Sequence, residues 1–178
     1  MDEVSRVLSV VRLDDVRTAL MLMYTCGMRP AEPMRLVPQD IDRGRMVILV
    51  RNGKGRKDRF VPMSERTLQS LKDFWHTHKC RELLFPHNTG DGTLRLDKVQ
   101  RIFKKALGES GVNKPEAVPR TLRHSFATHL VDAGIPIHVV KMVMGHKSLN
   151  TTVKYYVHLT PKMLASLSAA INRLAAKL

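Results

Sequence analysis

The segment 51–59 concentrates positive charge around a predicted turn. It reads RNGKGRKDR and holds five basic residues against one acid. Gly53 and Gly55 flank Lys54, and glycines on both sides permit a tight turn and a close approach to another molecule's backbone. Two interpretations stay open from these residues alone. The segment is either a solvated turn or a finger that brings a lysine against a phosphodiester.

A second segment, 118–126 (VPRTLRHSF), places two arginines on one face of a predicted helix. Arg120 and Arg123 are three residues apart, and a proline suited to a first helical turn precedes them. Paired guanidinium groups at a helix N-terminus make a good cradle for a phosphate. His124 lies about 100° further round the helix. An ordinary packed or surface role is the simpler interpretation for His124 and for His129.

A third segment, 144–156, contains two adjacent tyrosines. Leu149, Val153 and Tyr156 recur at helical spacing and form a predicted core stripe. Tyr155 lies about 100° before Tyr156 on the helix and projects away from the centre of that stripe. Adjacent tyrosines are commonly both packing residues, so a structural pair and one presented tyrosine both stay open.

Arg29 follows Gly27 at the end of an apolar predicted helix, and Glu32 lies three residues further on. An ordinary ion pair is one interpretation of this spacing. The other is a guanidinium that a carboxylate holds rigidly in a binding site.

The composition fits a folded protein with a polyanionic partner. The chain has 178 residues, of which 43% are hydrophobic, which is enough for the core of one domain. The formal net charge is +14, and such a surplus lies on the surface. No apolar run reaches the roughly 18 residues of a membrane span. Two cysteines exclude a disulfide framework and fit a reducing bacterial cytoplasm, and no Cys/His cluster has zinc-like spacing.

Periodicity and capping residues predict a mainly α domain with one small antiparallel sheet, an α+β fold, over residues 1–178. Asp14 or Asp15 is expected to cap a buried helix that ends at Gly27. A short helix is expected to start at Pro30. Strands are predicted at 46–50 and 59–62, and further helices at 64–78 (capped by Ser64), 96–107, 120–133, 136–144, 148–157 and 161–177.

Together these segments resemble the catalytic domain of the tyrosine recombinases, the phage integrase family, and above all its Xer-type and integrase-like bacterial members. The resemblance runs from about Asp14 to Tyr156. Four ordered motifs carry it: CGMRPAEP at 26–33, NGKGRKDR at 52–59, LRHSFATHL at 122–130, and MGHKSLNTT at 144–152 followed by Tyr155. The resemblance implies the catalytic-domain fold of that family.

The resemblance also implies six catalytic residues, namely Arg29, Lys54, Arg120, Arg123, His146 and Tyr155. Arg29 and Arg123 match the two catalytic arginines of the family, and Glu32 matches the usual supporting acid of the first. Lys54 matches the lysine of the hairpin, and Lys57 is the less favoured substitute for it.

The implied reaction breaks and rejoins DNA strands without a metal or a cofactor. Tyr155 would attack a DNA phosphorus and expel the 5′-hydroxyl, which leaves a 3′-phosphotyrosine link. The arginines would neutralise the non-bridging oxygens, and Lys54 would protonate the leaving oxygen. His146 would hydrogen-bond the phosphate or position Tyr155.

Two features depart from the family pattern. The family usually has histidine, or sometimes lysine, three residues before the second arginine, where this chain has Arg120. A guanidinium stays protonated and cannot serve as an ordinary general base, although it can still bind a phosphate oxygen. The family also has an N-terminal core-binding domain that is absent here, so we expect either an isolated catalytic fragment or a naturally short relative.

The implied partner is double-stranded DNA, with no membrane partner. Further DNA contacts are expected from Arg51, Arg56, Lys57, Arg59, Lys98, Arg101 and Lys105. The resemblance implies a homo-oligomer, a tetramer, on DNA and a monomer in isolation, with the helix in 161–178 docking on a neighbour or packing on its own chain. The alternatives are a DNA-binding module of the same fold with weakened or lost cleavage, and a relaxing activity like that of a type IB topoisomerase.

Overall fold

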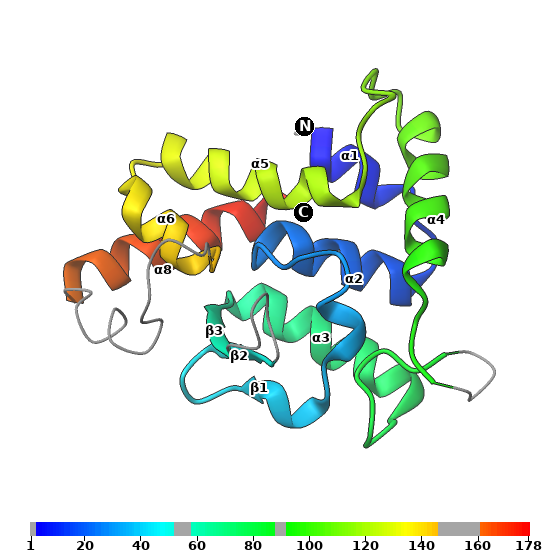
Figure 1. The fold of residues 1–178 in the computed structure, drawn as a ribbon, viewed down its shortest axis with the longest axis horizontal. Coiled ribbons are helices and arrows are strands. Elements are labelled where there is room, and N and C mark those ends of the chain that lie inside the picture. The colour runs from blue at the N-terminus through cyan, green and yellow to red at the C-terminus, as the bar shows by residue number, and fades with distance from the viewer. Residues whose placement is uncertain (1–2, 52–57, 88–91, 146–160) are drawn as a thin grey trace.

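Helices make up most of the computed structural model, which describes residues 3–51, 58–87, 92–145 and 161–178 (Figure 1). The α-helices are α1 (Glu3–Ser9), α2 (Asp14–Thr25), α3 (Glu65–His78), α4 (Leu96–Glu109), α5 (Pro119–Asp132), α6 (Ile137–Val143) and α8 (Pro161–Ala176). Two short 3-10 helices, η1 (Pro33–Arg35) and η2 (Pro38–Asp40), precede the strands β1 (Ile41–Asp42), β2 (Val47–Val50) and β3 (Arg59–Pro62). The predicted mainly α fold with a small antiparallel sheet is confirmed.

Helix α2 is the centre of the fold. Almost all of its residues from Val16 onward are buried, and it packs against α1, α3, α4, α5 and α8, with α5 above it and α3 below it in Figure 1. The sequence predicted this buried helix and its end near Gly27. The predicted cap was wrong, because the N-cap is Leu13 without a side-chain cap bond. Asp15 instead accepts a hydrogen bond from Lys98 at 2.6 Å.

The strands form one antiparallel sheet in the order β1-β2-β3. Val50 pairs with Arg59, so the ends of β2 and β3 lie side by side where they lead to 52–57, which is outside the described residues. Strand β1 was not predicted, because it has only two residues and one of them is Asp42, a poor strand former. The sheet thus forms the base of the predicted basic hairpin.

Two helices begin at the residues that the sequence indicates. Ser64 caps α3 and accepts a hydrogen bond from the Thr67 N–H at 3.0 Å. Pro119 occupies the first turn of α5. The helix predicted at Pro30 is wrong, because the chain turns there and forms η1 three residues later. The predicted helix 148–157 lies outside the described residues.

The last helix packs on its own chain. Helix α8 contacts α2, α3 and α5, and the side chains that it buries there are Leu167, Ala170, Ile171, Leu174 and Ala175. Docking of this segment on a neighbouring chain stays a prediction. Helix α1, which was not predicted, packs against α2 and α4. The first and last described helices therefore both rest on α2.

Candidate active site

The loop after α2 brings two helices together. Gly27 has a φ of +60°, and a Cβ on it would lie 2.5 Å from Cδ1 of Phe126 on α5. Both the backbone angle and the lack of space require glycine at this position. Because Gly27 has no side chain, the end of α2 approaches α5 closely, and this brings the loop that carries Arg29 near Arg123 on α5.

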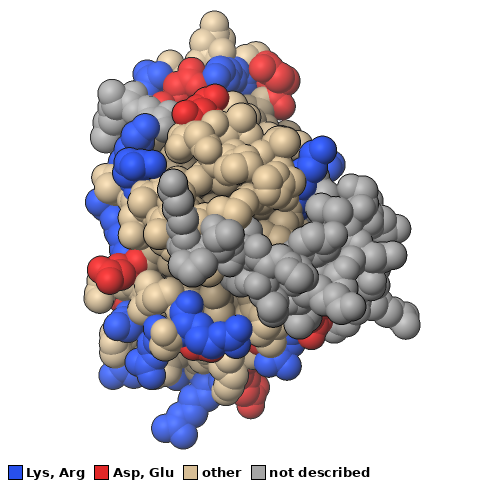
Figure 2. All heavy atoms as spheres, turned by 90° about the vertical axis from the view of Figure 1, so that its left-hand side faces the viewer, with Lys and Arg blue, Asp and Glu red and all other residues tan. Residues whose placement is uncertain are grey.

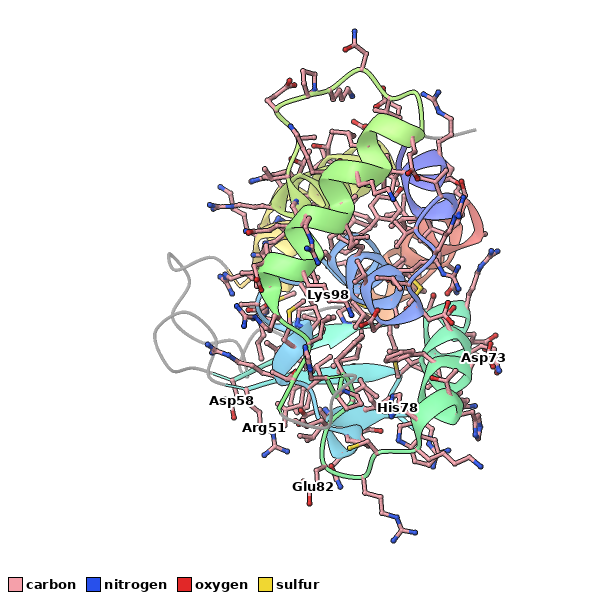
Figure 3. The ribbon with its side chains drawn as sticks, turned by 90° about the vertical axis from the view of Figure 1, so that its right-hand side faces the viewer. Arg51, Asp58, Asp73, His78, Glu82 and Lys98 are labelled. Atoms are coloured by element: carbon pink, nitrogen blue, oxygen red, sulfur yellow. The ribbon has the colours of Figure 1, made fainter. Side chains whose placement is uncertain are left out.

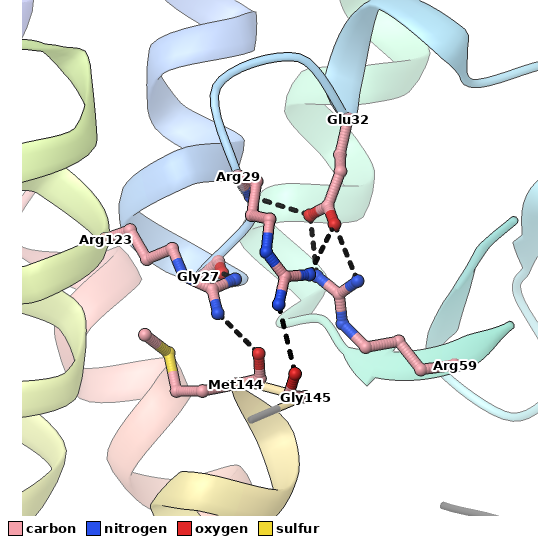
Figure 4. A network of polar contacts seen from close by, with 7 residues as sticks. All are labelled: Gly27, Arg29, Glu32, Arg59, Arg123, Met144 and Gly145. Carbon is pink, nitrogen blue, oxygen red and sulfur yellow. Dashed lines mark hydrogen bonds and ion pairs between the residues drawn. The ribbon is translucent and has the colours of Figure 1, made fainter. Parts of the chain in front are cut away.

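Arg29 is held at both ends of its guanidinium. The predicted Arg29–Glu32 ion pair is present, with Nη1 of Arg29 2.9 Å from Oε1 of Glu32. The backbone N–H of Arg29 donates to Oε2 of the same carboxylate at 2.6 Å. On the other side, Nη2 donates to the carbonyl oxygen of Gly145 at 3.0 Å, just beyond α6 (Figure 4).

Arg123 comes from α5 and is only 5% exposed. Its Nη1 donates to the carbonyl of Gly27, and its Nη2 donates to the carbonyl of Met144. Burial, followed by the positive charges of Arg29 and Arg59, lowers the pKa of Arg123 to about 10, so it stays cationic at neutral pH. Among the described residues no carboxylate pairs with Arg123, and backbone dipoles hold its charge in place.

Arg59, which was predicted to contact DNA, lies buried inside the protein. Its side chain is 4% exposed and forks Glu32, with Nη1 2.7 Å from Oε1 and Nη2 2.6 Å from Oε2. Arg59 and Val61 share the buried side of β3, and this explains why the Arg59 side chain points into the protein. Burial acts to raise the pKa of Glu32, but hydrogen bonds and charge from Arg59, together with hydrogen bonds from Arg29, hold that pKa below its ordinary value.

These four residues, Arg29, Glu32, Arg59 and Arg123, form what we call the arginine cluster (Figure 4). The cluster holds three guanidinium groups and one carboxylate, which bonds to Arg29 and Arg59, so it carries excess positive charge in a largely buried place. Like charges held together away from water are unfavourable unless an anion joins them. The cluster is therefore suited to bind an anion with several oxygen acceptors, such as a phosphate group.

A pocket of about 710 Å³ opens beside the cluster. It brings together Arg29, Arg120 and Arg123, three of the predicted catalytic residues. His124 also lines the pocket. Its position on the helix had favoured an ordinary packed or surface role, but the pocket spans more than one face of α5. The other lining residues are Pro30, Ala31, Leu96, Gln100, Val118 and Pro119. The three arginines are suited to a phosphate group, and the mostly apolar walls are suited to the sugar beside it.

Two further predicted DNA contacts take part in ion pairs. Nε of Arg51, on a side chain that is 54% exposed, donates to Oδ1 of the buried Asp40 at 2.6 Å. The amino group of Lys98, on a side chain that is 19% exposed, is 2.6 Å from Oδ2 of Asp15. Figure 3 shows Lys98 between α4 and α2. Lys98 therefore ties the two helices together, and its contact with DNA stays a prediction.

The remaining predicted cations of α4 lie at the surface. Arg101 is exposed, and the amino group of Lys105 lies 3.6 Å from Oε1 of Glu109 with both side chains largely in water. Figure 2 shows many Lys and Arg side chains and fewer acidic ones on another face of the molecule. The positive surplus is thus spread over the surface as well as concentrated in the arginine cluster.

Five predicted site residues lie outside the described residues, namely Lys54, Arg56, Lys57, His146 and Tyr155. The described chain leads up to them, because β2 and β3 flank 52–57 and Gly145 directly precedes 146. Arg29 and Arg123 hold the carbonyls of the two residues before His146. In the part of the chain that is described, no group of three or more His, Cys, Asp or Glu side chains is placed to hold a metal ion. No helix there has both the length and the apolar character needed to cross a membrane.

The fold and the cluster together define a mainly helical domain with three arginines held close together. The model of the phage integrase family matches residues 2–163, and this chain belongs to that family.

Three known proteins show how far the similarity extends. The protein y4qK of Sinorhizobium fredii (strain NBRC 101917 / NGR234), described as an integrase/recombinase, is 38% identical over 167 residues, which cover 94% of this chain and 54% of that protein. The crystal structure of XerA recombinase has a TM-score of 0.73 at 25% identity, covering 94% of this chain and 62% of that one. The Tn1549 transposon integrase, solved in complex with circular intermediate DNA, has a TM-score of 0.65 at 22% identity, covering 90% and 60%. This chain thus spans a little over half the length of the proteins that it matches.

Proposed function

We propose that this chain is the catalytic domain of a site-specific DNA recombinase, which breaks and rejoins strands through a covalent bond to Tyr155. The arginine cluster carries the proposal, because its excess positive charge borders a pocket that Arg120 also lines. A phosphodiester supplies the missing negative charge, and the charge on its oxygens grows in the transition state. Membership of the phage integrase family supports the same conclusion.

In the proposed reaction the phenolic oxygen of Tyr155 attacks a DNA phosphorus in line. A bond from phosphorus to Tyr155 forms while the bond to the 5′-oxygen breaks, and the strand ends in a 3′-phosphotyrosine. Lys54 gives a proton to the leaving 5′-oxygen. Attack by the 5′-hydroxyl of another strand reverses the step, so the bond energy is kept and no external co-reactant is needed.

The proton of the tyrosine needs an acceptor. Arg120 stands where the family usually has histidine, and a guanidinium does not take up a proton at neutral pH. Histidine does so near neutral pH, and there are two candidates: His146, from its motif, and His124, from its place in the pocket lining. Arg120 then serves as a third phosphate ligand beside Arg29 and Arg123.

The partner in this proposal is double-stranded DNA in the bacterial cytoplasm. The net charge of +14 supports a polyanion as partner, and so does the likeness in fold to an integrase solved with circular intermediate DNA. We further propose a tetramer on DNA and a monomer without it. Sedimentation of the chain alone and with its duplex measures both states, and a monomer in both samples would contradict the tetramer.

A covalent-trapping assay tests the proposed reaction. The probe is an end-labelled duplex randomised on both sides of a nick, so that the fragment released by cleavage diffuses away and the covalent link accumulates. The 178-residue chain is expected to give a labelled band that survives SDS, and sequencing of the trapped DNA gives its preferred site. Tyr155→Phe lacks the attacking oxygen and is expected to give no band, whereas the matched control Tyr156→Phe is expected to keep it.

The other outcomes of the assay separate the alternatives. A band that survives Tyr155→Phe and is lost in Tyr156→Phe would assign the nucleophile to the other tyrosine. Tight binding of the selected duplex with no covalent band would favour a DNA-binding module that has lost cleavage. Relaxation of supercoiled plasmid without strand exchange would favour a topoisomerase-like activity.

A further inference from the structure

Arg59 occupies an unusual place for an arginine. It is buried on β3, and both of its terminal nitrogens are taken up by Glu32. Its Nε is also buried and, among the described residues, has no hydrogen-bond partner. A buried donor without an acceptor is unfavourable, and Arg59 adds a positive charge to a cluster that already has an excess. Charge balance alone therefore does not explain an arginine here.

The geometry of the shared carboxylate suggests what Arg59 does. Oε1 of Glu32 accepts from Nη1 of Arg59 and from Nη1 of Arg29, at 2.7 and 2.9 Å. Oε2 accepts from Nη2 of Arg59 and from the backbone N–H of Arg29, at 2.6 Å each. A carboxylate offers about four acceptor positions, so Arg59 fills half of them. Because its fork binds in the carboxylate plane, it fixes that plane and with it the direction of the Arg29 guanidinium.

Arg59 also touches the second partner of Arg29. Gly145 has a φ of +61°, and a Cβ on it would lie 2.7 Å from Cδ and 3.1 Å from Nε of Arg59. The backbone of Gly145 therefore packs directly against the Arg59 side chain. The carbonyl of the same glycine accepts from Nη2 of Arg29 at 3.0 Å. Arg59 thus contacts both groups that hold the Arg29 guanidinium.

We propose that Arg59 is a positioning residue, which aims the Arg29 guanidinium at the DNA phosphate by holding both of its partners, Glu32 and Gly145. This inference rests on the proposed function, because Arg59 acts through a phosphate ligand and does not itself touch DNA. A role in charge balance alone makes a different prediction, since lysine would then replace Arg59 without loss.

Arg59→Lys separates the two roles. Lysine keeps the charge and most of the side-chain length, but its ammonium is a point charge that cannot fork both oxygens of Glu32. We expect the rate of covalent-band formation at saturating duplex to fall about tenfold to hundredfold, as is usual for a misplaced catalytic group. The dissociation constant of the duplex is expected to change less than about threefold. The matched control is Arg17→Lys, an exposed arginine paired with Asp14 at the other end of α2, which is expected to cleave at the wild-type rate.

A double-mutant cycle tests whether Arg59 works through Arg29. In the Arg29→Ala background there is no guanidinium left to aim, so adding Arg59→Lys is expected to slow cleavage by less than about twofold. A purely structural role would instead slow cleavage by the same factor in both backgrounds. That result would overturn the proposal, and so would an Arg59→Lys variant that cleaves as fast as Arg17→Lys.

A second readout works without DNA. The side-chain ¹⁵N–¹H signal of Nε in Arg29 is expected to report a rigid group in the wild type and a mobile one in Arg59→Lys, with the backbone spectrum of α2 and α5 unchanged. An equally rigid Arg29 in both proteins would contradict the positioning role. If the wild type forms no Tyr155-dependent band, the proposed function fails. A rigid Arg29 that loosens in Arg59→Lys would then still support the positioning contact itself.

Discussion

The arginine cluster and the exposed cations of α4 carry the same kind of charge in opposite surroundings. Arg59 and Arg123 are each 5% exposed, and their terminal nitrogens bond to a carboxylate or to backbone carbonyls. On α4, Arg101 is exposed, and Lys105 meets its acid at 3.6 Å in water. One region fixes its cations, whereas the other leaves them adaptable.

The cost of removing charges from water explains why the two regions differ in energy. An ion pair in water contributes about 0–1 kcal/mol, whereas a buried charge that loses its partner costs about 3–5 kcal/mol. The net charge of +14 indicates that the protein meets a polyanion, but it does not indicate which cations take part in chemistry. Fixed hydrogen bonds are more informative, because they hold the guanidinium groups of Arg29 and Arg123 in one orientation before a phosphate arrives.

The largest contrast is expected from removing one acid in each region. Glu32→Gln leaves the guanidinium groups of Arg29 and Arg59 without their carboxylate, and we expect it to lower the free energy of unfolding by about 3–5 kcal/mol. Glu109→Gln, the matched change on α4, removes only an exposed pair and is expected to cost less than about 0.5 kcal/mol. Urea denaturation measures both, and equal losses would erase the distinction between the regions.

The same two variants are expected to differ in how their stability, relative to the wild type, depends on pH. The pKa of Glu32 is held below its ordinary value when the chain is folded. Its contribution to stability is therefore fully present above the ordinary pKa of a glutamate and is lost as the pH falls through the lower, folded value. The stability difference between wild type and Glu32→Gln is expected to shrink in this acid range. The difference between wild type and Glu109→Gln is expected to stay small throughout, and a Glu32 difference that does not change with pH would contradict the pairing.

A glycine in each region gives the next largest contrast. Gly27→Ala forces a Cβ to within 2.5 Å of Phe126 at a φ of +60°, and we expect it to lower the free energy of unfolding by about 3 kcal/mol. Gly108 lies in α4, where a Cβ would meet nothing within 4 Å. Gly108→Ala is therefore expected to raise stability by about 0.5–1 kcal/mol. Thermal melts in which Gly27→Ala is as stable as the wild type would refute the close approach of α2 and α5.

Arg120 combines features of both regions, because it is exposed like the cations of α4 and also lines the pocket beside the arginine cluster. Arg120→His restores the residue type that the family usually has there and supplies a group able to accept a proton. We expect the rate of covalent-band formation to be preserved or raised. A loss of more than about tenfold with the fold intact would mean that the guanidinium itself is essential.

The smallest contrast lies within α4 itself. Arg101→Gln removes an exposed cation, so we expect the duplex affinity to fall a few-fold and the salt dependence of log K to weaken by about one unit, without loss of stability. Lys98→Gln breaks the tie to Asp15, so we expect lower stability and an unchanged salt slope. Binding titrations at several salt concentrations measure both slopes. The opposite assignment would show that Lys98 reaches DNA and Arg101 does not.

Local signals in the sequence predicted most of the fold. The apolar run of α2, the Ser64 cap and the strand pair at 46–50 and 59–62 each depend on neighbouring residues, and the structure contains all three. Strand β1 was missed because two residues carry no periodic pattern. The Lys98–Asp15 ion pair was missed because the two residues lie 83 positions apart in the chain, and spacing on one helix does not reveal such a contact.

The site was predictable in part for the same reason. The Arg29–Glu32 pair follows from a spacing of three residues and is present. Arg59 was grouped with the basic hairpin, although its alternation with Val61 on β3 was a signal for burial. The carbonyls that hold Arg123 come from Gly27 and Met144, and backbone acceptors leave no trace in residue types.

The central claim is that the arginine cluster neutralises the charge of one phosphodiester, and a change in the substrate tests it most directly. The duplex selected by trapping is made with a methylphosphonate at the cleaved position, which removes the negative charge there. Arg29→Ala, which leaves the fork of Arg59 on Glu32 in place, is compared with wild type on both duplexes. We expect a loss of about 10²–10³-fold on the natural phosphodiester and at most about tenfold on the neutral one. Equal losses on the two duplexes would contradict the claim.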